Sequence, residues 1–219
     1  MVESTARVEA FSDGVFAIAI TLLILEIRLP ETGSQLGGRS LWAGLAGLWP
    51  SYLAFVLSFS VILIMWINHH ELMRLVRAVD YPLLFANGLL LLGVTFVPFP
   101  TAVLARNLAT GEAAAAVTFY CGTFVGISLT WGLLFLTMVR RGLLRREVHS
   151  STVARIRRAY AAGPIVYSVA TAVAFFRPLL GLALNASLWI LWIRLCYHDI
   201  HVAAEEGDLL RDSARGRSG

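Results

Sequence analysis

The sequence predicts an all-α integral membrane protein with six transmembrane helices, and three observations support this. Of its 219 residues, 58% are hydrophobic and only 15% are charged, whereas a soluble domain has about 45–50% apolar and about 25% charged residues. Several long runs carry no charge at all. All 18 basic residues are arginines, and they cluster between these runs as expected of loops that orient a membrane protein. This placement also argues against nucleic acid as a partner, despite the net charge of +4.

The charge-free runs predict all the helices except the first. Each run approaches or exceeds the roughly 20 residues that cross the hydrocarbon core of a bilayer. We expect the corresponding spans at about residues 42–68, 81–105, 113–139, 158–176 and 178–200. The last two are separated only by Arg177-Pro178, which predicts a tight hairpin. Residues 203–219 are small, polar and charged, and we expect them to form a disordered tail.

The first apolar segment is unusually short. Gly14–Leu25 holds 12 uncharged residues between Asp13 and Glu26, and about 18 Å of helix does not cross a core of about 30 Å. Extending it to residues 6–28 gives about 34 Å, but brings charged side chains into the membrane or its interface. Such charges normally face a protein interior or a water-filled cavity. The segment is therefore either a helix lying on the membrane or a spanning helix hidden from lipid by the rest of the protein.

The distribution of arginine favours the spanning alternative. With the N-terminus inside, thirteen arginines lie in cytoplasmic segments and Arg194 lies near the inner end of the last span. The outside then holds only Arg28, Arg39, Arg106 and Arg177. This bias predicts six spans with both termini in the cytoplasm. The complete absence of lysine is typical of a GC-rich bacterial genome, so we expect a bacterial plasma membrane.

A helical wheel gives the first segment two distinct faces. At about 100° per residue, Ile18, Leu22 and Leu25 share one face, with Thr21 on its shoulder. Asp13 points elsewhere and needs a partner within the protein. An apolar stripe on a helix usually packs against neighbouring helices. The charged ends of this segment, however, suit a helix at a central, partly hydrated position in the protein.

Two motifs in the first two spans resemble a known family. The run Arg7-x-x-x-Phe11-Ser12-Asp13-Gly14, followed by VFAIAITLLILEI, resembles the first-helix signature of the transmembrane protein 175 family. The stretch Trp66-Ile67-Asn68-His69-His70 and the six-span pattern extend the resemblance over most of the chain. Members are potassium channels of endosomes and lysosomes, with single-repeat homologues in bacteria.

The resemblance implies a potassium channel, modestly selective over sodium, formed by residues 1–202. Its pore is lined by the first helices and has no re-entrant selectivity loop, and no TVGYG-like run of carbonyl donors occurs in this sequence. Because Phe-Ser-Asp occurs once, the implied assembly is a homotetramer. Potassium is the permeant ion, and no cofactor, metal site or enzymatic activity is implied.

The resemblance also assigns roles to individual residues. Ile18 matches the constriction, Leu22 and Leu25 match further apolar layers, and Thr21 matches a hydroxyl linked, with Ile18, to selectivity. A narrow ring of Ile18 side chains would block ions by excluding water. The implied structural polar network comprises Arg7, Ser12, Asp13, Trp66, His69 and His70. The two histidines could instead be a hydrated pair at a helix end.

Other functions remain open at this point. A secondary transporter or a proton-permeable cation pathway is the main alternative, since Pro50, Pro98 and Pro100 could break helices, although no internal repeat is visible. A membrane enzyme would have to use the run from Asn68 to Glu71, whose spacing differs from the zinc motif His-Glu-x-x-His. A scaffold without transport activity is the last possibility.

Overall fold

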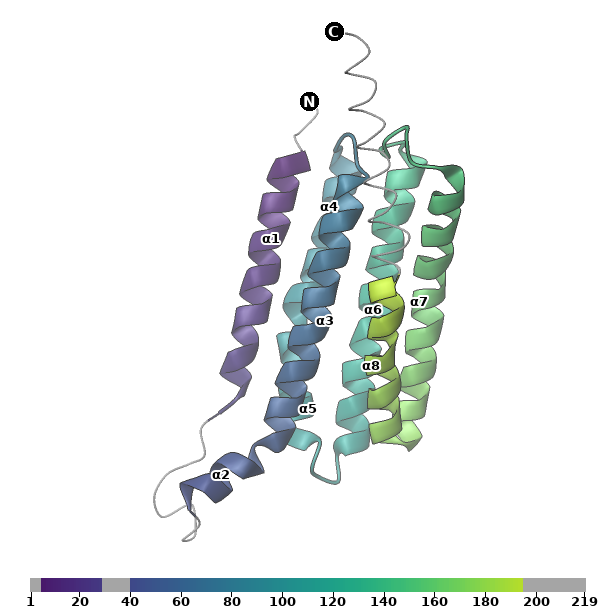
Figure 1. Cartoon of the computed structure of the whole chain (residues 1–219). Helices are drawn as coiled ribbons and strands as arrows, with labels where there is room; N and C mark the ends of the chain where they lie inside the picture. Colours follow the sequence, from purple (N-terminus) through teal and green to yellow (C-terminus); the bar gives the residue numbers. More distant parts are fainter. Residues whose placement is uncertain (1–4, 29–39, 195–219) are drawn as a thin grey trace.

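The computed structural model describes residues 5–28 and 40–194, which form a bundle of helices that run mostly side by side (Figure 1). The elements, in order, are α1 (Thr5–Leu22), the 3₁₀ helix η1 (Leu23–Glu26), α2 (Leu41–Gly47), α3 (Trp49–Arg74), α4 (Tyr81–Phe96), α5 (Pro98–Asn107), α6 (Ala113–Arg140), α7 (Ser150–Phe176) and α8 (Pro178–Arg194). The described residues contain no strand beyond one isolated bridge between Val76 and Leu144.

Five stretches of the bundle are long and apolar enough to cross a membrane. They are Thr5–Glu26, Trp49–Arg74, Tyr81–Asn107, Ala113–Arg140 and Ser150–Phe176. The shorter apolar helix α8 completes the set. Large apolar side chains are exposed around the outside of the bundle, as in helices that face lipid. The predicted all-α membrane fold is confirmed, whereas the predicted tail at 203–219 lies outside the described residues.

Several helix ends differ from the predicted spans. The span expected at 42–68 begins with a separate short helix, α2, because Pro50 lies in the first turn of α3, where proline starts a helix. α3 then continues to Arg74. The span expected at 81–105 is divided between α4 and α5 at Val97, since Pro98 and Pro100 lack the N–H groups needed to continue the helix. α7 begins at Ser150, two turns before the expected residue 158.

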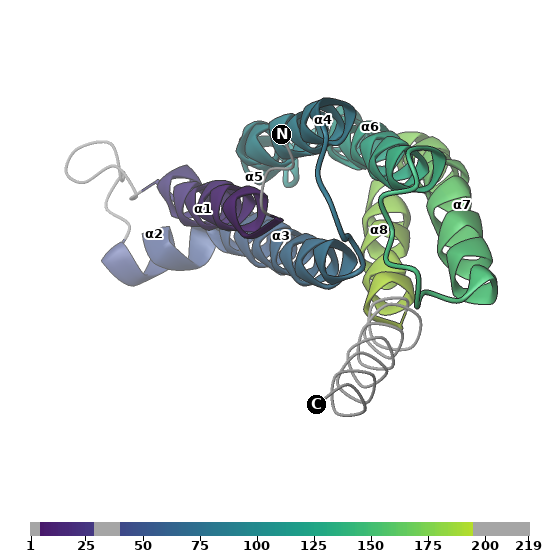
Figure 2. The ribbon, with the colours of Figure 1, turned by 90° about the horizontal axis from the view of Figure 1, so that it is seen from above.

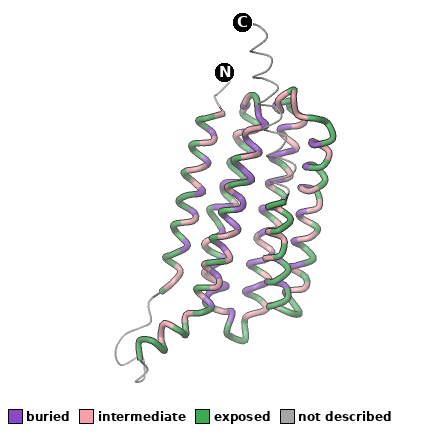
Figure 3. Tube along the Cα trace, in the orientation of Figure 1, coloured by how far each residue is buried: buried purple, intermediate pink, exposed green. Residues whose placement is uncertain are grey.

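The arrangement places α1 and α7 on opposite sides of the bundle. Viewed along the helices, α1 packs against α3 and α4, while α7 lies beside α6 and α8 (Figure 2). α6 contacts α4, α5, α7 and α8, and its Tyr120, Phe124 and Phe135 are among the largest fully buried side chains. The tube in Figure 3 shows buried and exposed residues alternating along α1, which therefore has one packed face and one open face.

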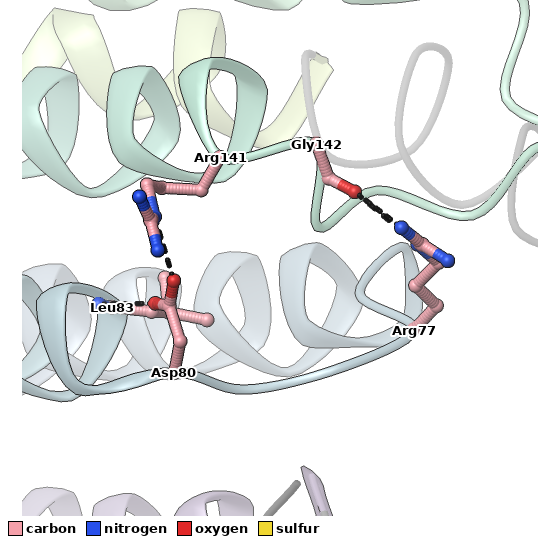
Figure 4. A network of polar contacts seen from close by, with 5 residues as sticks. All are labelled: Arg77, Asp80, Leu83, Arg141 and Gly142. Carbon is pink, nitrogen blue, oxygen red and sulfur yellow. Dashed lines mark hydrogen bonds and ion pairs between the residues drawn. The ribbon is translucent and has the colours of Figure 1, made fainter.

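Polar contacts hold the loop between α3 and α4 to the loop between α6 and α7 at one end of the bundle (Figure 4). Arg141 Nε donates to Asp80 Oδ2 at 2.8 Å, and Arg77 Nη2 donates to the Gly142 carbonyl at 3.0 Å. Asp80 also caps α4 by accepting from the Leu83 N–H at 3.0 Å. Desolvation raises the pKa of Asp80, but the hydrogen bonds and charge of these partners outweigh it and hold that pKa below its ordinary value. Gly142 has φ +63°, a conformation that glycine adopts without strain.

This joined end also holds the start of α1 and most arginines of the described chain, and we call it the arginine-rich end (Figure 1). Its arginines are Arg7, Arg74, Arg77, Arg140, Arg141, Arg145, Arg146, Arg155, Arg157 and Arg158. Arg28, Arg106 and Arg177 lie toward the opposite end. The charge asymmetry seen along the sequence is thus a separation between two ends of one bundle.

Candidate functional site

The site is built on α1, which packs into the bundle through a narrow strip. The buried residues of α1 and η1 recur every three or four positions, and they are Val8, Ser12, Phe16, Ala19 and Leu23. This spacing places them on one face, which contacts α3 and α4. Ser12 is the polar member of this strip and is fully buried.

The opposite face of α1 carries the residues predicted to line a pore. Ile18, Leu22 and Leu25 are 59%, 43% and 68% exposed, and Thr21 is exposed beside them. The Thr21 hydroxyl donates to the Ile18 carbonyl at 2.9 Å, which leaves its oxygen able to accept. The structure therefore places all four side chains on a surface that residues 5–28 and 40–194 leave exposed.

A carboxylate on α1 is bound to α3. Trp66 Nε1 donates to Asp13 Oδ1 at 2.8 Å, and the His70 ring stacks on the Trp66 ring with centroids 6.3 Å apart. Arg7 is exposed, and within residues 5–28 and 40–194 it makes no hydrogen bond or ion pair. Asp13 is thus partnered by a neutral indole donor, and Arg7 lies apart from this cluster.

A second, buried chain of hydrogen bonds connects α3, α4 and α1. His69 Nε2 lies 2.8 Å from Asn87 Oδ1, Asn87 Nδ2 donates to Ser12 Oγ at 3.0 Å, and Ser12 Oγ donates to the Val8 carbonyl at 2.8 Å. Asn87 and Ser12 each accept one hydrogen bond and donate one, so the directions along the chain are mutually consistent. Because an amide oxygen only accepts, His69 carries its proton on Nε2. The chain fixes the rotation of α1 against its neighbours.

Most members of the predicted polar network are brought together, and one further member is added. Ser12 and His69 belong to the buried chain, while Asp13, Trp66 and His70 belong to the cluster beside it. Asn87 is the residue that the sequence reasoning missed, although it joins α1 to α3. An amide within an otherwise apolar span is the sequence signal that could have identified it. In the structure Asn87 is buried, with 3% exposure.

The described part of the chain offers no grouping for metal chemistry. No cluster of three or more His, Cys, Asp or Glu side chains occurs within it. The side chains in the run from Asn68 to Glu71 have separate partners. His69 forms a hydrogen bond with Asn87, and Glu71 pairs with Arg74 at 3.1 Å.

The protein is an all-α membrane bundle. Its first helix is held by polar contacts on one face and bears an exposed apolar stripe on the other, which is the construction of a channel subunit. A family model described as the endosomal/lysosomal potassium channel TMEM175 matches residues 7–98. The chain is 46% identical over 172 residues to a potassium channel of Chamaesiphon minutus, covering 78% of this chain and 84% of the relative. It is 43% identical over 188 residues to a potassium channel of Streptomyces collinus, covering 84% and 89%.

A solved structure agrees with these relatives. The crystal structure of a lysosomal potassium-selective channel TMEM175 homolog from Chamaesiphon minutus matches with a TM-score of 0.77 and 42% identity, covering 88% of this chain and 98% of that chain. This chain belongs to the TMEM175 family, which consists of ion channels and not of enzymes.

Proposed function

We propose that this protein is a potassium channel, modestly selective over sodium, with a pore lined by α1. The observation that carries the proposal is the open face of α1, where Ile18 and Leu25 are 59% and 68% exposed on a segment that carries Asp13 near its middle and Glu26 at its end. Such a helix suits a central position, where its apolar stripe faces other copies and its charges face protein or water.

The channel is a homotetramer in this proposal. One chain supplies one α1, so a closed pathway on a symmetry axis requires several copies. α1 packs chiefly against α3 and α4, which leaves its stripe free to face an axis. Four copies is the number that the family resemblance implies.

The constriction works through the cost of removing water from ions. A ring of Ile18 side chains, extended by Leu22 and Leu25, offers no oxygen ligand and empties of water when narrow. Thr21 supplies a hydroxyl oxygen beside the ring. Potassium passes more readily than sodium because it holds its hydration water less tightly. The polar contacts of Asp13 and Ser12 set the rotation of α1 and hence the width of this ring.

The arginine-rich end faces the cytoplasm, by the positive-inside rule. With α1 spanning once and both termini on that side, the chain is a multi-pass protein of a bacterial plasma membrane. Potassium is the permeant species, and no cofactor takes part.

Ion flux into liposomes that contain the purified full chain tests this function. An outward potassium gradient should drive uptake of a proton-coupled dye, and replacing potassium with sodium should reduce it. Ile18→Asn should raise flux and lower discrimination between the two ions. Ile24→Asn changes an isoleucine of the same segment that is 53% exposed but lies off the stripe, and should keep the wild-type discrimination.

The same liposomes distinguish the alternatives. Dye uptake driven by an imposed proton gradient, with potassium equal on both sides of the membrane, would indicate a proton-permeable pathway. Saturable flux that requires a counter-substrate would indicate a secondary transporter. Unchanged flux and discrimination in Ile18→Asn would remove this residue from the constriction.

A further inference from the structure

Arg7 lies on the same face of α1 as the residues proposed to line the pore. At about 100° per residue, Arg7 and Phe11 each fall within about 20° of Ile18 on a helical wheel. Arg7 is exposed, and Phe11 and Ile18 are 66% and 59% exposed. The buried strip that contacts α3 and α4 is centred on Ser12, about 120° away from Ile18. The open face of α1 therefore extends from the proposed constriction back to the first turn of the helix.

Arg7 lies at one end of this open face. It precedes Ile18 by 11 positions, which is about 16 Å along a helix. α1 begins at Thr5, at the arginine-rich end of the bundle (Figure 1). Because side chains lean toward the N-terminus of their helix, the guanidinium group of Arg7 extends away from Ile18. It therefore lies at the mouth of the proposed pore and not in its constriction.

No carboxylate compensates the charge of Arg7 within residues 5–28 and 40–194, where Arg7 forms no hydrogen bond or ion pair. Glu9 lies about 160° from Arg7 on the wheel, and Asp13 accepts from Trp66 Nε1. A groove of about 360 Å³ lies beside Arg7, and its other lining residues are uncharged. They are Val8, Phe11, Leu84, Asn87, Gly88 and Leu91.

The opposite end of the same segment carries charges of both signs. Glu26 ends η1, and its Oε2 lies 3.9 Å from Arg106 Nη2. Arg28 follows η1 and is exposed. The open face of α1 has only positive charge at its first turn, so the two ends of the proposed pore differ in their charges.

We propose that Arg7 lines the cytoplasmic mouth of the pore, where its positive charge limits the entry of potassium from the cytoplasm. This inference rests on the proposed function, in which α1 lines the pore of a homotetramer and the arginine-rich end faces the cytoplasm. Four copies place four guanidinium groups around the axis. Their repulsion lowers the local concentration of cations at that mouth, so it opposes outward current more than inward current.

The size of this effect depends on the salt concentration. For a monovalent cation on the axis in water, about 8 Å from each of four guanidinium groups, the local concentration falls about fourfold at about 0.15 M salt. At about 0.01 M salt the Debye length is about 30 Å, and the depletion reaches about fifteenfold. At about 1 M salt almost no depletion remains.

Inside-out membrane patches that contain the full chain test the inference, because they expose the cytoplasmic face. With equal potassium on both sides, the ratio of outward to inward current is measured at opposite voltages of equal size. Arg7→Gln should raise this ratio about fourfold at about 0.15 M potassium and leave it nearly unchanged at about 1 M. Arg7→Lys keeps the charge and should behave as wild type. Arg28→Gln removes an arginine at the other end and should not raise the ratio.

A cysteine variant separates the effect of charge from an effect on folding, because it is modified in the assembled channel. In Arg7→Cys, a positively charged methanethiosulfonate applied to the cytoplasmic face should lower the ratio, and a negatively charged one should raise it. Wild type treated with the same reagents is the control.

The outcomes keep this inference apart from the proposed function. A potassium current that discriminates against sodium, with the same current ratio in wild type and Arg7→Gln, would overturn this inference alone. An equal rise of the ratio in Arg7→Lys and Arg7→Gln, or equal effects of the two reagents on Arg7→Cys, would also overturn it. The lack of any potassium current in wild type would overturn the proposed function, and this inference with it.

Discussion

Replacing Asn87 with leucine should destabilise the bundle strongly, because this amide is the single link between two buried polar groups. Asn87 Oδ1 accepts from His69 Nε2, and Asn87 Nδ2 donates to Ser12 Oγ. Both partners are fully buried at 0% exposure. Leucine has a similar volume, so the substitution removes hydrogen bonds without opening a large cavity.

The magnitude follows from what each partner loses. The His69 N–H is left buried without an acceptor, at a cost of about 1–3 kcal/mol. Ser12 keeps its bond to the Val8 carbonyl and loses only an incoming donor, which costs about 0.5–1.5 kcal/mol. We therefore expect Asn87→Leu to lower the free energy of unfolding by about 2–4 kcal/mol.

Reversible unfolding in mixed micelles, followed by circular dichroism at fixed protein concentration, measures this loss. Asn107→Leu is the control, since among the described residues that amide donates to the Val103 carbonyl of its own helix and to no other element, and it should cost well below 1 kcal/mol. In a Ser12→Ala background the Asn87→Leu loss should shrink by about 0.5–1.5 kcal/mol, the coupling between the two residues. A loss under about 0.5 kcal/mol, or strictly additive variants, would refute the hydrogen-bond chain as drawn.

Three further predictions concern other parts of the bundle. The pKa of Asp80 is held below its ordinary value of 3.8, so its carboxylate stabilises the fold above pH 3.8. This stabilisation is lost as the pH falls through the lower pKa of the folded state. Asp80→Asn should therefore flatten the dependence of the free energy of unfolding on pH in this acidic range. Gly181→Ala places a Cβ on the backbone and side chain of Ala174 and should cost about 1–3 kcal/mol in thermal unfolding, whereas Gly126→Ala, with open space around it, should cost nothing. Tyr120→Phe removes a hydroxyl that lies 3.1 Å from Ser58 Oγ and should lower the free energy of unfolding by about 0.5–1.5 kcal/mol.

Features that depend on one helix alone could be predicted from the sequence. The stripe of Ile18, Leu22 and Leu25 follows from helical periodicity, and the structure leaves it exposed. Its role in conduction stays a prediction. The all-α membrane fold follows equally from the apolar runs, because their length and composition suffice to identify spans.

Features that depend on several helices could not be predicted in this way. Ser12 and Asn87 lie 75 positions apart, and nothing in either local pattern shows that their helices touch. Pro50 was named as a residue that could break a helix, but the predicted span at 42–68 ran through the division at Leu48, because proline in the first turn of a helix leaves the surrounding run charge-free. The early start of α7 at Ser150 was missed because its first turns project beyond the apolar run.

The polar contacts of α1 also bear on how the chain is made. The partner of Asp13 follows it by 53 positions and the partner of Ser12 by 75, so at about 5–20 residues per second each appears about 3–15 s later. During that interval α1 leaves the ribosome with a carboxylate that lipid does not satisfy, whereas the Ser12 hydroxyl already donates to the Val8 carbonyl of its own helix. We expect the insertion machinery to retain α1 until α3 and α4 emerge. The three helices would then enter the bilayer together as the first stable unit of the nascent chain.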